Sequence, residues 1–132
     1  MRNLAGVCAL VAAFAPGAAQ AADSISCTGV GRDDVALELT LGSLPVLQPV
    51  GAFVAVGDRH FAFGVPEAAT PLVVGQAYGE GGLTAIDFTD PNVETIVVSV
   101  RLWRAEEADT TATAGVLRVA DIGAFAITCE GP

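Results

Sequence analysis

The residue types that carry nucleophilic catalysis are scarce in this chain. Such a mechanism needs a nucleophile, a base and a group that orients the base. His60 is the single histidine among 132 residues, and it follows Arg59 at an expected hairpin tip. Ser43 and Ser99 are the nearest candidates for a nucleophile, but neither lies in a Gly-x-Ser-x-Gly context. The sequence therefore gives no support to a serine hydrolase.

Carboxylates are plentiful, with 15 Asp and Glu against 6 Lys and Arg. Two carboxylates at a suitable separation are enough for glycoside hydrolysis. However, Glu38 is expected on the outward face of a strand, and only Tyr78 and Trp103 are available as aromatic platforms for a sugar. A carboxylate-dependent hydrolase remains the lesser alternative, and the chain is predicted not to be an enzyme.

One cluster of oxygen ligands is a weak candidate for a calcium site. Calcium prefers hard oxygen ligands, and four such residues lie within eight positions around a predicted turn: Asp87, Asp90, Asn92 and Glu94. Their spacing does not match the Asp-x-Asp-x-Asp-Gly pattern of a helix-flanked calcium loop. No cofactor is therefore predicted.

Trp103 is the residue most indicative of protein binding. Strand alternation places it on an outward face beside Arg101, and exposed tryptophan with arginine is typical of interface hot spots. The alternative is that Trp103 packs under a neighbouring loop with an arginine stacked on its ring. An acidic segment follows directly in the sequence. The candidate partner-binding residues are Trp103, Arg101, Arg104, Glu106, Glu107 and Asp109.

The elements that must position these residues are strands, because nearly every segment alternates with period two. The longest such segment, about 93–104, is expected to place Ile96, Val98, Val100 and Leu102 inward and Val97 with Trp103 outward. Turn-forming residues at 57–59, 79–82, 90–92 and 121–123 separate the strands. About nine short strands and no convincing amphipathic helix predict an all-β domain, either a single antiparallel β-sandwich or a small β-barrel.

Two segments are the least strand-like, residues 42–50 with two prolines and residues 105–114 with an acidic run followed by Thr and Ala. Both are predicted to be loops. Loops held by a rigid scaffold commonly carry binding sites.

The first 21 residues have the features of a cleaved signal peptide. Arg2 forms a short basic region, residues 4–15 are apolar, and Ala19-Gln20-Ala21 is a small-x-small cleavage motif. A buried N-terminal helix is the alternative, which Pro16-Gly17 disfavours. The predicted division is therefore a signal peptide at 1–21 and a periplasmic or secreted domain at 22–132.

Cleavage would remove Cys8 and leave Cys27 and Cys129, near the two ends of the exported domain. In an oxidising compartment two such cysteines are expected to form a disulfide. The alternatives are free thiols or two metal ligands, but only His60 is available as a further ligand of the usual zinc type.

The formal net charge of −9 excludes the usual nucleic-acid binder, which needs clustered basic residues. No transmembrane segment is predicted in the mature chain, because no apolar run after residue 21 approaches the roughly 20 residues needed. The function predicted is an exported protein-binding or inhibitory module whose unknown partner is favoured to be basic. An envelope-associated structural protein, or a carrier of an apolar ligand lined by Phe53, Phe61, Phe63 and Phe88, is the alternative.

Overall fold

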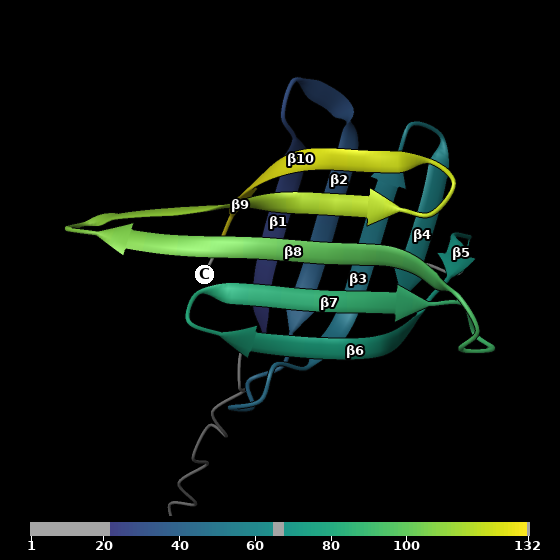
Figure 1. The fold of residues 1–132 in the computed structure, drawn as a ribbon, viewed down its shortest axis with the longest axis horizontal. Coiled ribbons are helices and arrows are strands. Elements are labelled where there is room, and N and C mark those ends of the chain that lie inside the picture. The colour runs from purple at the N-terminus through teal and green to yellow at the C-terminus, as the bar shows by residue number, and fades with distance from the viewer. Residues whose placement is uncertain (1–21, 65–67, 132) are drawn as a thin grey trace, which may run out of the picture.

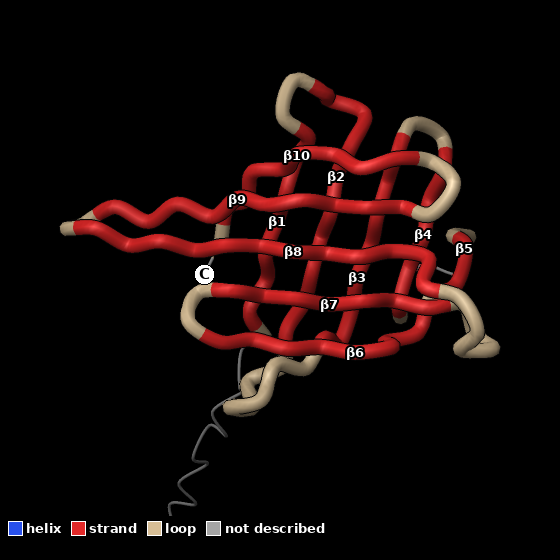
Figure 2. Tube along the Cα trace, in the orientation of Figure 1, coloured by secondary structure: helices blue, strands red, loops and turns tan. Residues whose placement is uncertain are grey.

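The computed structural model describes residues 22–64 and 68–131, and every regular element in them is a β-strand (Figures 1 and 2). The predicted signal peptide lies outside the described residues. None of the described residues forms a helix long and apolar enough to cross a bilayer. The strands are β1 Asp23–Gly29, β2 Arg32–Leu41, β3 Pro49–Val56, β4 Arg59–Phe63, β5 Thr70–Pro71, β6 Val73–Glu80, β7 Leu83–Thr89, β8 Ile96–Glu107, β9 Thr110–Val119 and β10 Gly123–Glu130.

All ten strands belong to one sheet in the order β5-β4-β3-β2-β1-β10-β9-β8-β7-β6. Neighbouring strands are antiparallel, except that β4 and the two-residue β5 are parallel. Strands β6–β10 form one layer that crosses over the layer of β1–β4 (Figure 1). Because β5 leads directly into β6, the sheet folds back on itself into a nearly closed barrel. The all-β prediction is confirmed, and the short β5 is the strand beyond the nine expected.

The space between the layers is filled by the inward residues of each strand. Alternation along β2 buries Val35, Leu37 and Leu39, and alternation along β8 buries Val98, Val100 and Leu102. Together with residues from β1, β3, β4, β7, β9 and β10, they form one apolar cluster. Its burial is the main favourable contribution to folding.

The four phenylalanines proposed to line a ligand cavity do not share a face. Phe61 and Phe88 are buried in the core, and Phe63 packs beside Phe88 with ring centroids 6.1 Å apart. Phe53 instead alternates with buried neighbours on β3 and lies outside the core cluster. Its ring lies beside that of His60, with the ring centroids 5.4 Å apart. The structure therefore corrects the expectation of a common phenylalanine-lined cavity.

Cys27 and Cys129 form the predicted disulfide. They lie directly opposite one another on β1 and β10, with Cα atoms 4.0 Å apart and an S–S distance of 2.08 Å. The bond therefore crosses the one junction in the sheet order where a strand of the first half of the chain pairs with a strand of the second half.

Residues 105–114 are not the predicted loop. Strand β8 continues to Glu107 and β9 starts at Thr110, with Glu106 opposite Thr111 across the hairpin. This hairpin extends beyond the rest of the sheet (Figure 2), so both of its faces meet solvent. A ribbon without a buried face shows no apolar alternation, which is why the sequence pattern missed it. Of the predicted loop at 42–50, residues 42–48 are irregular, whereas Pro49 and Val50 belong to β3.

A β-bulge changes the expected sides of two residues at the start of β8. Phe88 of β7 is opposite Val98, but Thr89 is opposite Ile96, so Val97 has no partner on β7. The extra residue turns Ile96 outward, where it is 42% exposed, and Val97 packs against the core. The expectation that Ile96 is inward and Val97 outward is therefore wrong.

The disulfide gives the first testable prediction. Replacing both cysteines (Cys27→Ser/Cys129→Ser) is expected to lower the free energy of unfolding by about 4 kcal/mol, because the bond closes a loop of 102 residues in the unfolded chain. Urea unfolding of the chain from residue 22 onward measures this loss. Ser24→Ala, on the exposed side of β1, is the control and is expected to change stability by less than about 0.5 kcal/mol. Two reactive thiols in natively purified protein would contradict the assignment.

Candidate functional site

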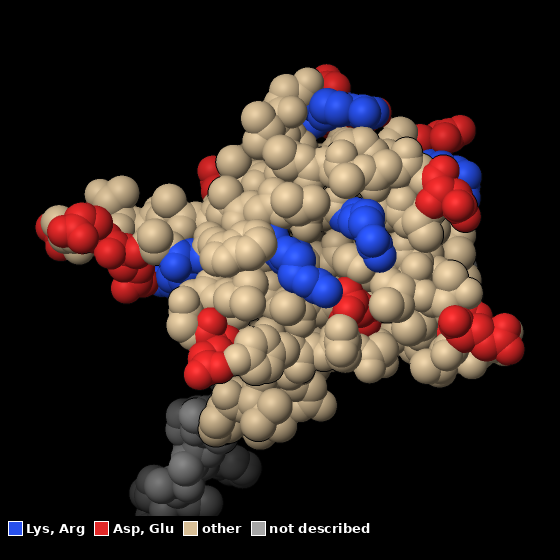
Figure 3. Space-filling model, in the orientation of Figure 1, with Lys and Arg blue, Asp and Glu red and all other residues tan. Residues whose placement is uncertain are grey.

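The outer face of the β6–β9 layer combines exposed apolar side chains with arginines. Tyr78, Ile96, Trp103 and Val116 are all exposed there, and Trp103 is 54% exposed. Figure 3 shows basic side chains over the middle of this face, surrounded mainly by uncharged residues. We name it the Trp–Arg face and define it by six residues: Tyr78, Ile96, Arg101, Trp103, Val116 and Arg118.

The register of β8 and β9 builds the centre of this face. Three successive outward pairs join the two strands: Trp103 with Ala114, Arg101 with Val116, and Ser99 with Arg118. Both strands are central in the sheet, so each is hydrogen-bonded on its two sides. The outward side chains therefore project from a backbone with little freedom to move.

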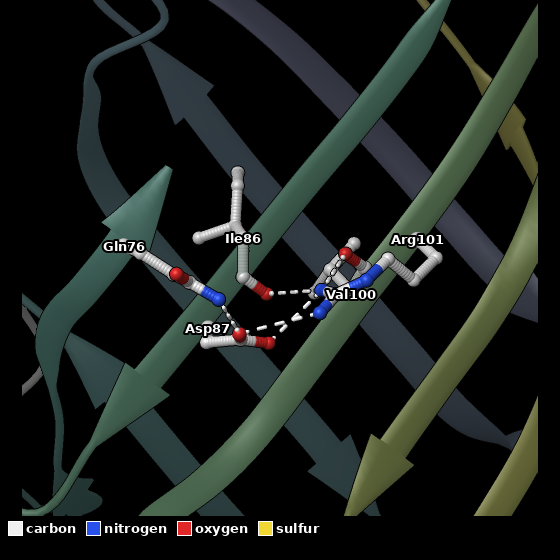
Figure 4. A network of polar contacts seen from close by, with 5 residues as sticks. All are labelled: Gln76, Ile86, Asp87, Val100 and Arg101. Atoms are coloured by element: carbon white, nitrogen blue, oxygen red, sulfur yellow. Dashed lines mark hydrogen bonds and ion pairs between the residues drawn. The ribbon is translucent and has the colours of Figure 1, made fainter. Parts of the chain in front are cut away.

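A buried carboxylate fixes one of the arginines (Figure 4). The Asp87 side chain is only 4% exposed, whereas that of Arg101 is 37% exposed. Arg101 donates from Nη1 to Asp87 Oδ1 at 2.9 Å and from Nη2 to Oδ2 at 3.2 Å. Its Nη1 also donates to the carbonyl oxygens of Val100 at 2.9 Å and Ile86 at 3.3 Å. Gln76 Nε2 also donates to Asp87 Oδ2, so this oxygen accepts from both Gln76 and Arg101.

These contacts change the protonation equilibrium of Asp87. Burial acts to raise the pKa of Asp87, but hydrogen bonds from Arg101, Gln76 and Ser99 outweigh it and hold the pKa below its usual value. Asp87 is therefore ionised at neutral pH, and its negative charge offsets that of Arg101.

Arg118 lies in a different electrostatic position. It is exposed, and among the residues that the structure describes it has no carboxylate partner. It lines a shallow depression of about 280 Å³ together with Asp87, Ile96, Ser99, Arg101 and Val116. In the depression, Asp87 therefore neutralises the charge of Arg101, whereas no carboxylate among the described residues neutralises the charge of Arg118.

The structure brings together only part of the predicted partner-binding set. Trp103 and Arg101 share the Trp–Arg face, and within the described chain the cation–π contacts join other pairs, so Trp103 is not packed under an arginine. Arg104 alternates to the opposite side of β8 and pairs with Glu106. Glu107 and Asp109 lie at the tip of the projecting hairpin.

Sequence reasoning missed four residues of the face, and the reasons differ. Alternation along β9 was sufficient to place Val116 and Arg118 on one side. The bulge concealed Ile96. Tyr78 comes from β6, and only the strand order shows that it belongs to the same layer as β8 and β9.

The three carboxylates among the four candidate calcium ligands do not gather into a cluster in the described part of the chain. Asp87 is held by Arg101, and Asp90 Oδ1 accepts hydrogen bonds from the backbone N–H groups of Thr95 at 2.8 Å and Glu94 at 2.9 Å. The Thr95 bond is the main cause that holds the pKa of Asp90 below its usual value. Within residues 22–64 and 68–131, no three His, Cys, Asp or Glu side chains gather as a metal site requires. Asp90 instead organises the turn between β7 and β8.

The Asp87–Arg101 pair gives a prediction about acid stability. Asp87→Asn is expected to lower the free energy of unfolding at pH 7 by about 1–3 kcal/mol, because Arg101 loses its charged partner while keeping some contact with water. The folded-state pKa of Asp87 is depressed, so its contribution is complete above the unfolded pKa of about 3.9 and is lost as the pH falls further.

Urea unfolding between pH 2 and pH 7 measures this dependence, and the wild-type stability is expected to fall more steeply below about pH 4 than that of Asp87→Asn. Asp58→Asn, in the exposed turn between β3 and β4, makes the same chemical change away from the pair. Equal pH profiles for the wild type and Asp87→Asn would contradict the role of this pair.

Comparison with protein-family models, curated proteins and solved structures finds no match to this chain.

Proposed function

We propose that this chain is an exported, non-enzymatic module that binds another protein through the Trp–Arg face, in a binding or inhibitory role. The observation that carries the proposal is the exposed Trp103 beside Arg101, whose guanidinium is fixed by the buried Asp87. Tryptophan, tyrosine and arginine are the residues most enriched among interface hot spots.

The rigidity of the face supports this function. Binding costs free energy when side chains must be ordered at the interface. Arg101 is already ordered by hydrogen bonds to Asp87 and to two backbone carbonyl oxygens, and Trp103 projects from a central strand. The guanidinium of Arg101 and the backbone beneath Trp103 therefore need little further ordering when a partner binds.

The charge distribution favours a basic partner. The chain has a formal net charge of −9, and three of its acidic residues, Glu106, Glu107 and Asp109, lie on the hairpin that projects beside the face. Figure 3 shows acidic side chains at the far end of this projection. A negative field of this kind increases the rate of encounter with cationic proteins.

An exported location agrees with the disulfide. Disulfides persist in oxidising compartments such as the periplasm or the extracellular space and are rare in the cytosol. The Cys27–Cys129 bond therefore supports a periplasmic or secreted protein, as does the predicted signal peptide.

The test is capture of a partner from an extract of the periplasm and cell envelope, followed by titration of the captured protein with purified variants. Trp103→Ala is expected to weaken binding by about 30-fold, the effect of a hot spot of about 2 kcal/mol. Val30→Ala, in the turn between β1 and β2, removes an apolar side chain of similar exposure, 58% against 54% for Trp103, outside the face and is expected to bind as the wild type does. Equal affinity of Trp103→Ala and the wild type would contradict the proposal.

A further inference from the structure

Arg118 is the one charged residue of the Trp–Arg face to which the proposed function gives no role. The depression beside it is lined by three charged groups, namely Asp87, Arg101 and Arg118. Because Asp87 and Arg101 offset one another, the lining has a net charge of about +1 in a protein whose formal charge is −9. A local positive site in an acidic protein favours an anion at that point.

We infer that this depression receives one acidic side chain of the protein partner, with Arg118 as the residue that binds its carboxylate. This inference rests on the proposed function and deepens it. A guanidinium carries five N–H donors in a fork that matches a carboxylate. Among the described residues, no side-chain hydrogen bond or ion pair uses the donors of Arg118.

The apolar residues of the lining determine which groups of the partner fit beside that carboxylate. Ile96 and Val116 are both exposed and both border the depression, so they offer apolar contact next to the cation. An acidic residue with an aliphatic neighbour therefore fits better than an isolated acidic residue. Partial removal of water by these side chains also strengthens a charge-assisted hydrogen bond.

Size and charge separate this ligand from other anions. A volume of about 280 Å³ is at the lower limit of small-molecule pockets but sufficient for one side chain. Polyanions such as nucleic acid or an anionic membrane bring many negative charges against the overall charge of −9, which repels them. A single carboxylate on an otherwise basic protein meets both the local and the overall charge.

The two charged regions together orient the partner. The hairpin with Glu106, Glu107 and Asp109 lies at one end of β8, and the depression lies nearer its other end, with Trp103 between them. A partner with a basic surface toward the hairpin and an acidic side chain toward Arg118 docks in one direction only. Opposite charges at two points fix the register of an interface.

The test uses a pair of matched peptides, acetyl-Leu-Asp-Leu-amide and acetyl-Leu-Asn-Leu-amide, titrated into the nitrogen-15-labelled chain from residue 22 onward and followed by NMR. The Asp peptide is expected to bind with a dissociation constant on the order of 1–10 mM, as a short ligand with few contacts should. Saturable shifts are expected for the Arg118 side-chain N–H and for the backbone amides of Ser99 and Val116. The Asn peptide is expected to bind at least about 10-fold more weakly.

Arg118→Gln is expected to remove the preference for Asp over Asn. Arg59→Gln is the matched control, because it loses the same charge from an exposed arginine outside the face. Equal binding of the two peptides, no saturable shift up to about 50 mM peptide, or an unchanged preference in Arg118→Gln would overturn the inference.

Binding of the two variants to the captured partner distinguishes a failure of this inference from a failure of the proposed function. If Trp103→Ala weakens capture but Arg118→Gln leaves it unchanged, the carboxylate site is wrong and the proposed function stands. If Trp103→Ala leaves capture unchanged, the proposed function itself fails, whatever the peptides show.

Discussion

Two runs of consecutive strands, β1–β5 and β6–β10, meet in the sheet where β1 pairs with β10. Within each run, neighbours in the sheet are neighbours in the chain, so their pairing closes only short loops. The β1–β10 pair instead joins residues 102 positions apart, and this closure costs the most chain entropy. The disulfide between Cys27 and Cys129 offsets that cost by restricting the unfolded chain, so the layered core depends on this pair of strands.

The site depends on this closure because of where β8 and β9 lie. With β10 held against β1, strand β9 has a neighbour on each side, and β8 lies between β9 and β7. Strands in the middle of a sheet hold their outward side chains more precisely than loops do. The buried pair of Asp87 and Arg101 extends this order from the backbone to the guanidinium.

The charges of this protein act at two different ranges. In the proposed function, the acidic residues of the hairpin and the net charge of −9 act over roughly a Debye length and affect how a partner would approach. The Trp–Arg face acts at contact, where Asp87 offsets Arg101 and Arg118 keeps its charge. An acidic protein therefore carries a locally basic surface at this face while its net charge stays negative.

The sequence by itself determined the all-β class, most of the turns and the disulfide. Each depends on local features, namely alternation along a strand, turn residues such as those at 57–59, and two cysteines placed near the ends of residues 22–132. The sequence also placed Trp103 on an outward face, because alternation assigns a side of the sheet to each residue of an unbroken strand.

Only the tertiary structure decided which strands are neighbours, and the candidate site depends on that. Alternation did not reveal that Asp87 lies beneath Arg101, or that Tyr78 of β6 shares a layer with Val116 of β9. The bulge at Val97, which has no partner on β7, turns Ile96 to the opposite face of the sheet. The two strands of the projecting hairpin pair with each other although neither face of the hairpin is buried. The physical reason is that alternation records burial along one strand, whereas a site on a sheet is built across several strands.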